Sequence, residues 1–143
     1  MIKTILVGLD GSEHARAAIA AVGRLGKAGA RLDVVLLNVG EIPAVLGELP
    51  AYDYEALLRE QRAQQEELLE AALIQARACG LESVTTQSAV GVPAQEIVRV
   101  AAEHGVDQIV MGNRGRNALA GLLLGSVAQR VVHLAEVPVL LVK

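Results

Sequence analysis

The chain has 143 residues and a formal net charge of -3 at pH 7; 52% of its residues are apolar, and Tyr, present twice, is the only aromatic type. This length suits one domain with an aliphatic core, and the charge argues against a general nucleic-acid binder, which needs a basic excess. The single cysteine, Cys79, excludes an intrachain disulfide and favours a reducing cytoplasm. We expect no membrane span and no signal peptide, because neither apolar pattern occurs.

Strand-like and helix-like patterns alternate along the first half of the chain. Ser12 is a good helix N-cap after an apolar run that ends at Leu9, and Gly80 is a typical helix stop. The middle of the long helix, Arg59 to Glu67, is almost entirely polar, and we expect it to face solvent. The expected elements are a strand over Ile2–Leu9, a helix from Ser12 to about Gly26, a strand over Leu32–Val39, a loop over Gly40–Pro50 and a helix over Tyr52–Cys79.

The same alternation continues to the C-terminus. Pro93 suits the first turn of a helix, but Val92 before it is a poor N-cap, so we expect a marginal helix start there. The expected elements are a strand over Ser83–Val90, a helix from Pro93 to His104, a strand over Asp107–Met111, a helix around Val127–Ala135 and a strand over Val137–Val142.

Helical crossovers between successive strands require parallel pairing with right-handed connections. The pattern therefore predicts an α/β fold: a three-layer open sandwich, doubly wound, with helices on both faces of a parallel sheet. Its ligand should lie beyond the carboxyl ends of the strands, where the strand order reverses. Asp10, Val39 and Gly112 each lie at or just past such an end, and we expect them to converge on one crevice.

A glycine motif connects the strand expected at Asp107–Met111 with the helix that follows. Its spacing is G-x2-G-x9-G-S, formed by Gly112, Gly115, Gly125 and Ser126. Glycine lets main-chain N–H groups approach a ligand closely, and a helix N-terminus adds unpaired donors and partial positive charge. The motif therefore favours a phosphate site over simple turn geometry. Arg114 suits phosphate as well, the alternative being a solvated loop.

Together these motifs resemble the ATP-binding subgroup of the universal stress protein family over essentially the whole chain. The resemblance rests on the segments Ile5–Ser12, Gly91–Ala94, Met111–Gly115 and Leu124–Val127. It implies a single universal stress protein domain, residues 1–143, whose five-stranded parallel sheet has the order 3-2-1-4-5. Asn113 departs from the Thr or Ser that is frequent in the family, and Gly121 from a larger polar or basic residue.

The resemblance also implies roles toward ATP. Asp10 would lie near the ribose and adenine, Val39 would recognise the adenine edge through its main chain, and Met111 and Gly112 would line the ribose side. The phosphates would be held by Arg114, Gly115, Gly125, Ser126 and Val127. Mg²⁺ would accompany the phosphates and could reach Asp10.

Two observations limit these assignments. Asp10 could instead cap the first helix or form an Asx turn with Ser12. The three histidines, His14, His104 and His133, show no metal-ligand spacing, so no direct metal motif is expected.

The last expected strand, Val137–Val142, should lie at an edge of the sheet. An uninterrupted apolar edge invites pairing with another chain, and Pro138 blunts only one end of it. Universal stress proteins often dimerise through this strand. We therefore expect a two-fold homodimer in which Val137–Val142 pairs with its copy.

The main functional hypothesis is a cytoplasmic stress-response or regulatory protein that binds ATP and hydrolyses it slowly at most. No catalytic residue stands out, because the G-x4-G-K-[ST] pattern is missing and the glycine loop holds no lysine. One alternative, an ATP-using transferase or hydrolase, would need a further acid, base or metal cluster. Another is a partner-binding module with a vestigial pocket. A receiver domain of this kind would need paired acidic residues where Asp10 stands alone, and a non-binding stress protein would normally lose the glycine motif that this chain keeps. The sequence identifies no signalling partner.

Overall fold

The computed structural model describes residues 2–42, 48, 50–114 and 124–143. In chain order these form β1 (Thr4–Leu9), α1 (Glu13–Lys27), β2 (Asp33–Gly40), α2 (Ala51–Ala78), β3 (Ser83–Val90), α3 (Pro93–Glu103), β4 (Gln108–Gly112), α4 (Ser126–Leu134) and β5 (Val139–Val142). Each expected strand and helix is present, and its ends lie within about two residues of the predicted ones, as is usual for element boundaries.

The strands form one five-stranded sheet with the order β3-β2-β1-β4-β5, and the four pairings are parallel. This confirms the predicted fold and strand order. The chain proceeds from β1 to β2 on one side and later returns to place β4 on the other side. The strand order therefore reverses between β1 and β4, which is where a doubly wound sheet opens a crevice.

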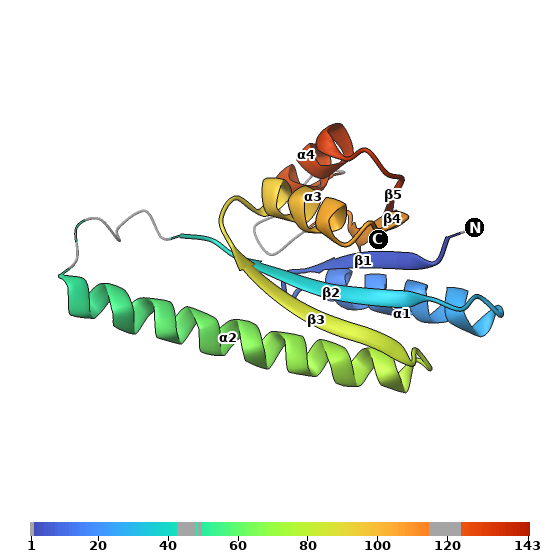
Figure 1. Ribbon diagram of the computed structural model, residues 1–143, viewed down its shortest axis with the longest axis horizontal. Coiled ribbons are helices and arrows are strands. Elements are labelled where there is room, and N and C mark those ends of the chain that lie inside the picture. The colour runs from blue at the N-terminus through green and yellow to red at the C-terminus, as the bar shows by residue number, and fades with distance from the viewer. Residues whose placement is uncertain (1, 43–47, 49, 115–123) are drawn as a thin grey trace.

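Helices cover both faces of the sheet, with α1 and α2 on one face and α3 and α4 on the other (Figure 1). Leu36 and Leu37 are adjacent in β2 and both fully buried, yet they belong to opposite aliphatic cores. This is the burial expected of inner strands in a parallel sheet. The two cores hold the strand ends in place, and the crevice lies at those ends.

Helix starts follow the predicted chemistry. The Ser12 hydroxyl accepts a hydrogen bond from the Ala15 N–H at 3.2 Å and caps α1. The N-cap residues of α3 and α4, which are Val92 and Gly125, make no side-chain cap hydrogen bond. The poor cap expected at Val92 is therefore confirmed, and Pro93 occupies the first turn as predicted.

The polar middle of α2 differs from the prediction. Gln65 lies within the stretch expected in solvent, but it is only 6% exposed. Gln65 precedes the buried Leu69 by four residues and Ala72 by seven, so it continues the inward-facing stripe of the helix. The prediction failed because the partners of this stripe change along the helix, from apolar side chains to main-chain carbonyl groups at the strand ends. No helix in the described ranges has the length and apolarity that a membrane crossing requires.

Candidate functional site

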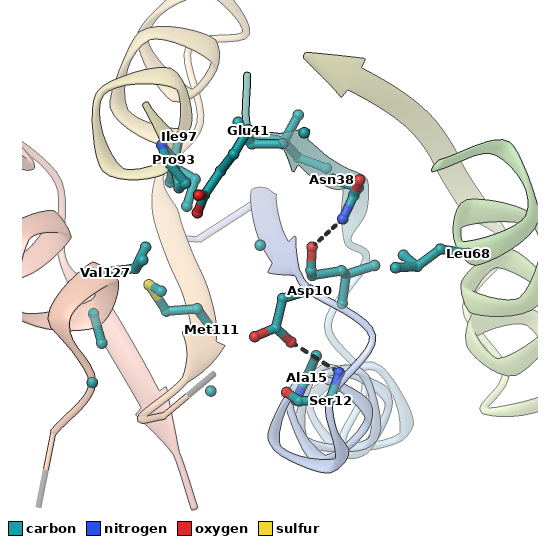
Figure 2. A pocket seen from close by; sticks show the side chains of 18 of the residues that line it. Asp10, Ser12, Ala15, Asn38, Glu41, Leu68, Pro93, Ile97, Met111 and Val127 are labelled. Carbon is teal, nitrogen blue, oxygen red and sulfur yellow. Dashed lines mark hydrogen bonds between the residues drawn. The ribbon is translucent and has the colours of Figure 1, made fainter. Parts of the chain in front are cut away.

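A cavity of about 680 Å³ lies at the carboxyl ends of the inner strands, and its wall includes residues of α2, α3 and α4 (Figure 2). Of the nine predicted site residues, eight line it: Asp10, Val39, Met111, Gly112, Arg114, Gly125, Ser126 and Val127. The ninth, Gly115, lies outside the described residues. The convergence expected for Asp10, Val39 and Gly112 is thus present in the fold.

At the α4 side, the wall of the cavity is formed by the first turn of the helix. The N–H groups of a first helical turn have no partner within the helix, and the N-cap of α4, Gly125, has no side chain that could cap them. Ser126 and Val127 of this turn both line the cavity. Gly125 differs, since its N–H donates to the Asn113 carbonyl at 2.7 Å. The donors offered to a ligand therefore begin at Ser126, one residue later than the glycine motif indicates.

Arg114 adds positive charge to the same side. Its Nε is buried and has no hydrogen-bond partner within the described part of the chain. Arg114 itself lines the cavity, so its positive charge is available to an anion there. The N-terminus of α4 and Arg114 thus form a pair of features suited to a phosphate group.

Packing explains the glycine at position 112, and the sequence did not reveal this reason. A Cβ on Gly112 would lie 2.6 Å from the His14 Cβ and 2.9 Å from the His14 carbonyl carbon. Its φ is not positive, so turn geometry does not explain the glycine. Glycine is needed here because the first turn of α1 packs directly on the end of β4. This requirement is independent of any ligand.

Asp10 forms the Asx turn that was one alternative for it. Its Oδ1 accepts a hydrogen bond from the Ser12 N–H at 2.9 Å. Figure 2 shows the same carboxylate directed into the cavity between Ser12 and Met111. A carboxylate has about four acceptor positions, so this turn does not prevent a contact with a ligand.

Val39 lies where β2 separates from β1. The β1–β2 register ends at the pair Leu9 and Asn38. Gly40 turns its carbonyl toward β3, where it accepts from the Gly91 N–H at 2.9 Å. Successive residues of a strand direct their main-chain groups to opposite neighbours, so those of Val39 point to the β1 side. Just past Leu9, that side is the cavity.

Several lining residues were not predicted. Asn38 is 7% exposed and its Nδ2 donates to the Leu9 carbonyl at 2.8 Å, joining the ends of β1 and β2 (Figure 2). Glu41 points its carboxylate into the cavity (Figure 2). A polar residue inside the apolar run of β2 is a signal that could have identified Asn38. Gln61 and Gln65 of α2 also line the cavity, but their sequence pattern is that of an exposed helix face.

The cavity contains charges of both signs. Asp10 and Glu41 bring carboxylates from the ends of β1 and β2, and Arg114 and the α4 N-terminus bring positive charge from the segments that follow β4. Among the described residues, no group of three or more His, Cys, Asp or Glu side chains could hold a metal ion. The arrangement suits a ligand with an anionic end and a neutral, hydrogen-bonding end.

The family model described as the universal stress protein family matches residues 1–143. The chain belongs to this family. A universal stress protein of Thermus aquaticus is 40% identical to it over 147 residues, which cover 100% of both chains. The resemblance to the universal stress protein family is therefore confirmed.

Solved structures of universal stress proteins share this fold. The MJ0577 protein of Methanocaldococcus jannaschii superimposes with a TM-score of 0.88 at 32% identity, covering 100% of this chain and 96% of that one. A universal stress protein in complex with cAMP superimposes with a TM-score of 0.71 at 27% identity, covering 99% of this chain and 97% of that one.

Proposed function

We propose that this universal stress protein binds an adenine nucleotide, with ATP and its Mg²⁺ as the main ligand, in the cavity beyond β1, β2 and β4. The observation that carries the proposal is the N-terminus of α4, whose first residues Ser126 and Val127 line the cavity together with Arg114. The cavity volume of about 680 Å³ falls in the usual range for small-molecule sites. The cAMP complex of a relative supports an adenine nucleotide as the ligand class.

The phosphates would lie at α4. The main-chain N–H groups of Ser126 and Val127 would donate to phosphate oxygens, and Arg114 would neutralise part of their charge. Gly115 belongs to the same proposed phosphate-binding motif. Gly125 would contribute by its small size rather than as a donor, because its N–H already bonds to Asn113.

The nucleoside would lie toward β2. The main chain of Val39 would recognise the adenine edge, and Asp10 would accept hydrogen bonds from the ribose hydroxyl groups. Met111 and Gly112 would line the ribose side. Mg²⁺ would arrive with the phosphates, with Asp10 within the same cavity to bind it directly or through water.

The role that follows is regulatory rather than metabolic. The described lining residues include no lysine or histidine, and their carboxylates are those of Asp10 and Glu41. ATP hydrolysis would therefore be slow at most, and we propose a cytoplasmic stress-response protein whose state depends on its bound nucleotide. Rapid steady-state turnover of ATP would instead favour an ATP-using hydrolase or transferase.

A proline substitution tests the proposed phosphate donors. Ser126 is the first residue of α4, where proline is tolerated, and Gly125 before it has the extended ψ of 157° that proline requires. Ser126→Pro removes one N–H donor, whereas Ser126→Ala removes only the hydroxyl. Because a hydrogen bond to a charged group contributes about 1.5–3 kcal/mol, Ser126→Pro should weaken ATP binding about 10- to 100-fold.

Isothermal titration with ATP and with adenosine, in the presence of Mg²⁺, provides the measurement. Ser126→Ala should bind ATP nearly as wild type does, and adenosine affinity should be nearly equal in all three proteins. Wild-type protein that does not bind ATP at millimolar concentration, or ATP affinity unchanged by Ser126→Pro, would contradict the proposal.

A further inference from the structure

The glutamines of α2 hold the end of β2, and we propose that Gln65 is a positioning residue that sets base selectivity. It would do so by fixing the main chain just before Val39, while Gln61 fixes the main chain just after it. The inference rests on the proposed nucleotide site. It extends that site to α2, which contributes no residue to the glycine motif.

Gln65 is attached to two strands at once. Its Nε2 donates to the Asn38 carbonyl at 3.3 Å and to the Ala89 carbonyl at 3.0 Å. Asn38 immediately precedes Val39, and Ala89 is the β3 residue in register with Val39. The side chain is only 6% exposed, although it belongs to a helix stretch of polar residues. One buried amide thus bridges β2 and β3 at the level of Val39.

A second glutamine holds the chain on the other side of Val39. The Gln61 Nε2 donates to the Glu41 carbonyl, and Gln61 lies one helical turn before Gln65. Gly40 makes room for both amides, because a Cβ there would lie 2.9 Å from the Gln61 Nε2 and 3.1 Å from the Gln65 Nε2. The three residues form a clasp over the end of β2.

The clasp matters because β2 is no longer paired with β1 beyond Asn38. Beyond this residue, one side of β2 therefore faces the cavity. The position of the Val39 main chain then depends on β3 and on the clasp. Hydrogen bonding to a base edge requires donor–acceptor distances near 2.9 Å. Small displacements of Val39 should therefore weaken base recognition without affecting the phosphate end at α4.

A merely structural role for Gln65 makes a different prediction, and Gln75 is the matched control. Gln75 lies on the same helix, and its Nε2 donates to the Arg16 carbonyl at 3.0 Å, outside the nucleotide cavity. Gln65→Met and Gln75→Met each remove one side-chain amide and keep an unbranched side chain of similar length. Both variants should lose stability, but only Gln65→Met should change base selectivity.

The experiment measures the dissociation constants of ATP, GTP and inorganic tripolyphosphate for wild type and the two variants. One buried hydrogen bond corresponds to about a two- to tenfold effect, so Gln65→Met should reduce the preference for ATP over GTP by that factor. Tripolyphosphate affinity should stay unchanged. Gly40→Ala, which displaces both amides, should reproduce the loss of selectivity. Hydrogen exchange at the Val39 and Gly40 amides, without nucleotide, should be faster in Gln65→Met than in Gln75→Met.

The outcomes separate this inference from the proposed function. An unchanged ATP-to-GTP preference in Gln65→Met, in a wild type that binds ATP, overturns the inference and leaves the nucleotide site intact. A wild type that binds neither nucleotide refutes the proposed function and the selectivity role with it. In that case, hydrogen exchange at the Val39 and Gly40 amides still tests the clasp. Faster exchange in Gln65→Met than in Gln75→Met supports the clasp, and equal exchange in the two variants overturns it.

Discussion

Gly112 illustrates a motif residue that packing also requires. Its missing Cβ leaves room for His14 in the first turn of α1. We expect Gly112→Ala to lose about 1–3 kcal/mol of stability even without ligand, since α1 would have to move away from β4. Urea unfolding of the ligand-free protein measures this.

Gly8→Ala is the control for that substitution. Gly8 also lines the cavity, but its Cβ would meet the Ile97 Cδ1 at 3.5 Å, an ordinary contact. A Gly112→Ala variant no less stable than Gly8→Ala would show that α1 does not require the glycine.

Asp10 combines a structural and a proposed ligand-binding role, and two substitutions separate them. Asp10→Asn keeps an acceptor for the Ser12 N–H, so its stability should stay close to that of wild type. Asp10→Ala removes the acceptor and should cost about 1 kcal/mol. If the carboxylate charge serves ribose or Mg²⁺, both variants should bind ATP with Mg²⁺ more weakly. Thermal unfolding and ATP titration measure the two effects. Full ATP affinity in Asp10→Asn would limit the role of Asp10 to the turn.

Among the elements, β1 and β4 are joined at the end of the sheet opposite the cavity. The Asp107 Oδ2, just before β4, accepts from the N–H groups of Lys3 and Thr4 at 2.9 Å each. These bonds, that of Thr4 foremost, hold the pKa of the Asp107 carboxyl below its ordinary value of 3.8. A carboxyl whose pKa is lowered by folding stabilises the protein above its unfolded pKa. That contribution is lost as the pH falls through the folded pKa.

Asp107→Asn should therefore be less stable than wild type at neutral pH, and the difference should vanish in acid. Denaturant unfolding from about pH 6 to about pH 2 measures both proteins, and their difference isolates Asp107 from the other carboxyl groups. The gap should stay constant above about pH 4 and close below it. A gap that persists unchanged at about pH 2 would assign it to packing rather than to the charge.

For the whole molecule, the edge strand β5 is the surface we propose for dimerisation. β5 ends the strand order, and large apolar side chains on it and on α4 are exposed, namely Val132, Leu134 and Leu140. An apolar sheet edge favours pairing with a second copy. We propose a homodimer through Val137–Val142, with twice the chain mass of 15.0 kDa.

Leu140→Glu should convert this dimer to a monomer, because it places two like charges in the paired edge. Ile74→Glu is the control, since Ile74 on α2 is 65% exposed and lies away from β5. Light scattering after size-exclusion chromatography gives the mass of each protein. A wild-type monomer at micromolar concentration, or equal masses for wild type and Leu140→Glu, would contradict the proposal.

The parts of the fold that the sequence predicts are those with a periodic or family signal. Apolar runs located the strands, and the motif around Gly112 indicated the family and hence the strand order. Gln65 escaped prediction because its partners are carbonyl groups distant in the sequence, which leave no pattern on the helix. The packing of Gly112 on His14 is similarly a contact between distant segments. The sequence marks Asn113 only as a departure from the residue frequent in the family, although its main chain connects β5 with the start of α4.

That connection has a consequence for regulation. The Asn113 N–H donates to the Val142 carbonyl of β5 at 2.9 Å, and its own carbonyl accepts from Gly125 at the start of α4 at 2.7 Å. One residue therefore connects the edge strand β5 with the start of α4, where we propose that the phosphates bind. In the proposed dimer, the free energy that a bound nucleotide adds to subunit association equals the free energy that association adds to nucleotide binding. The proposed nucleotide site and the proposed dimer edge are thus joined by the main chain of one residue, Asn113.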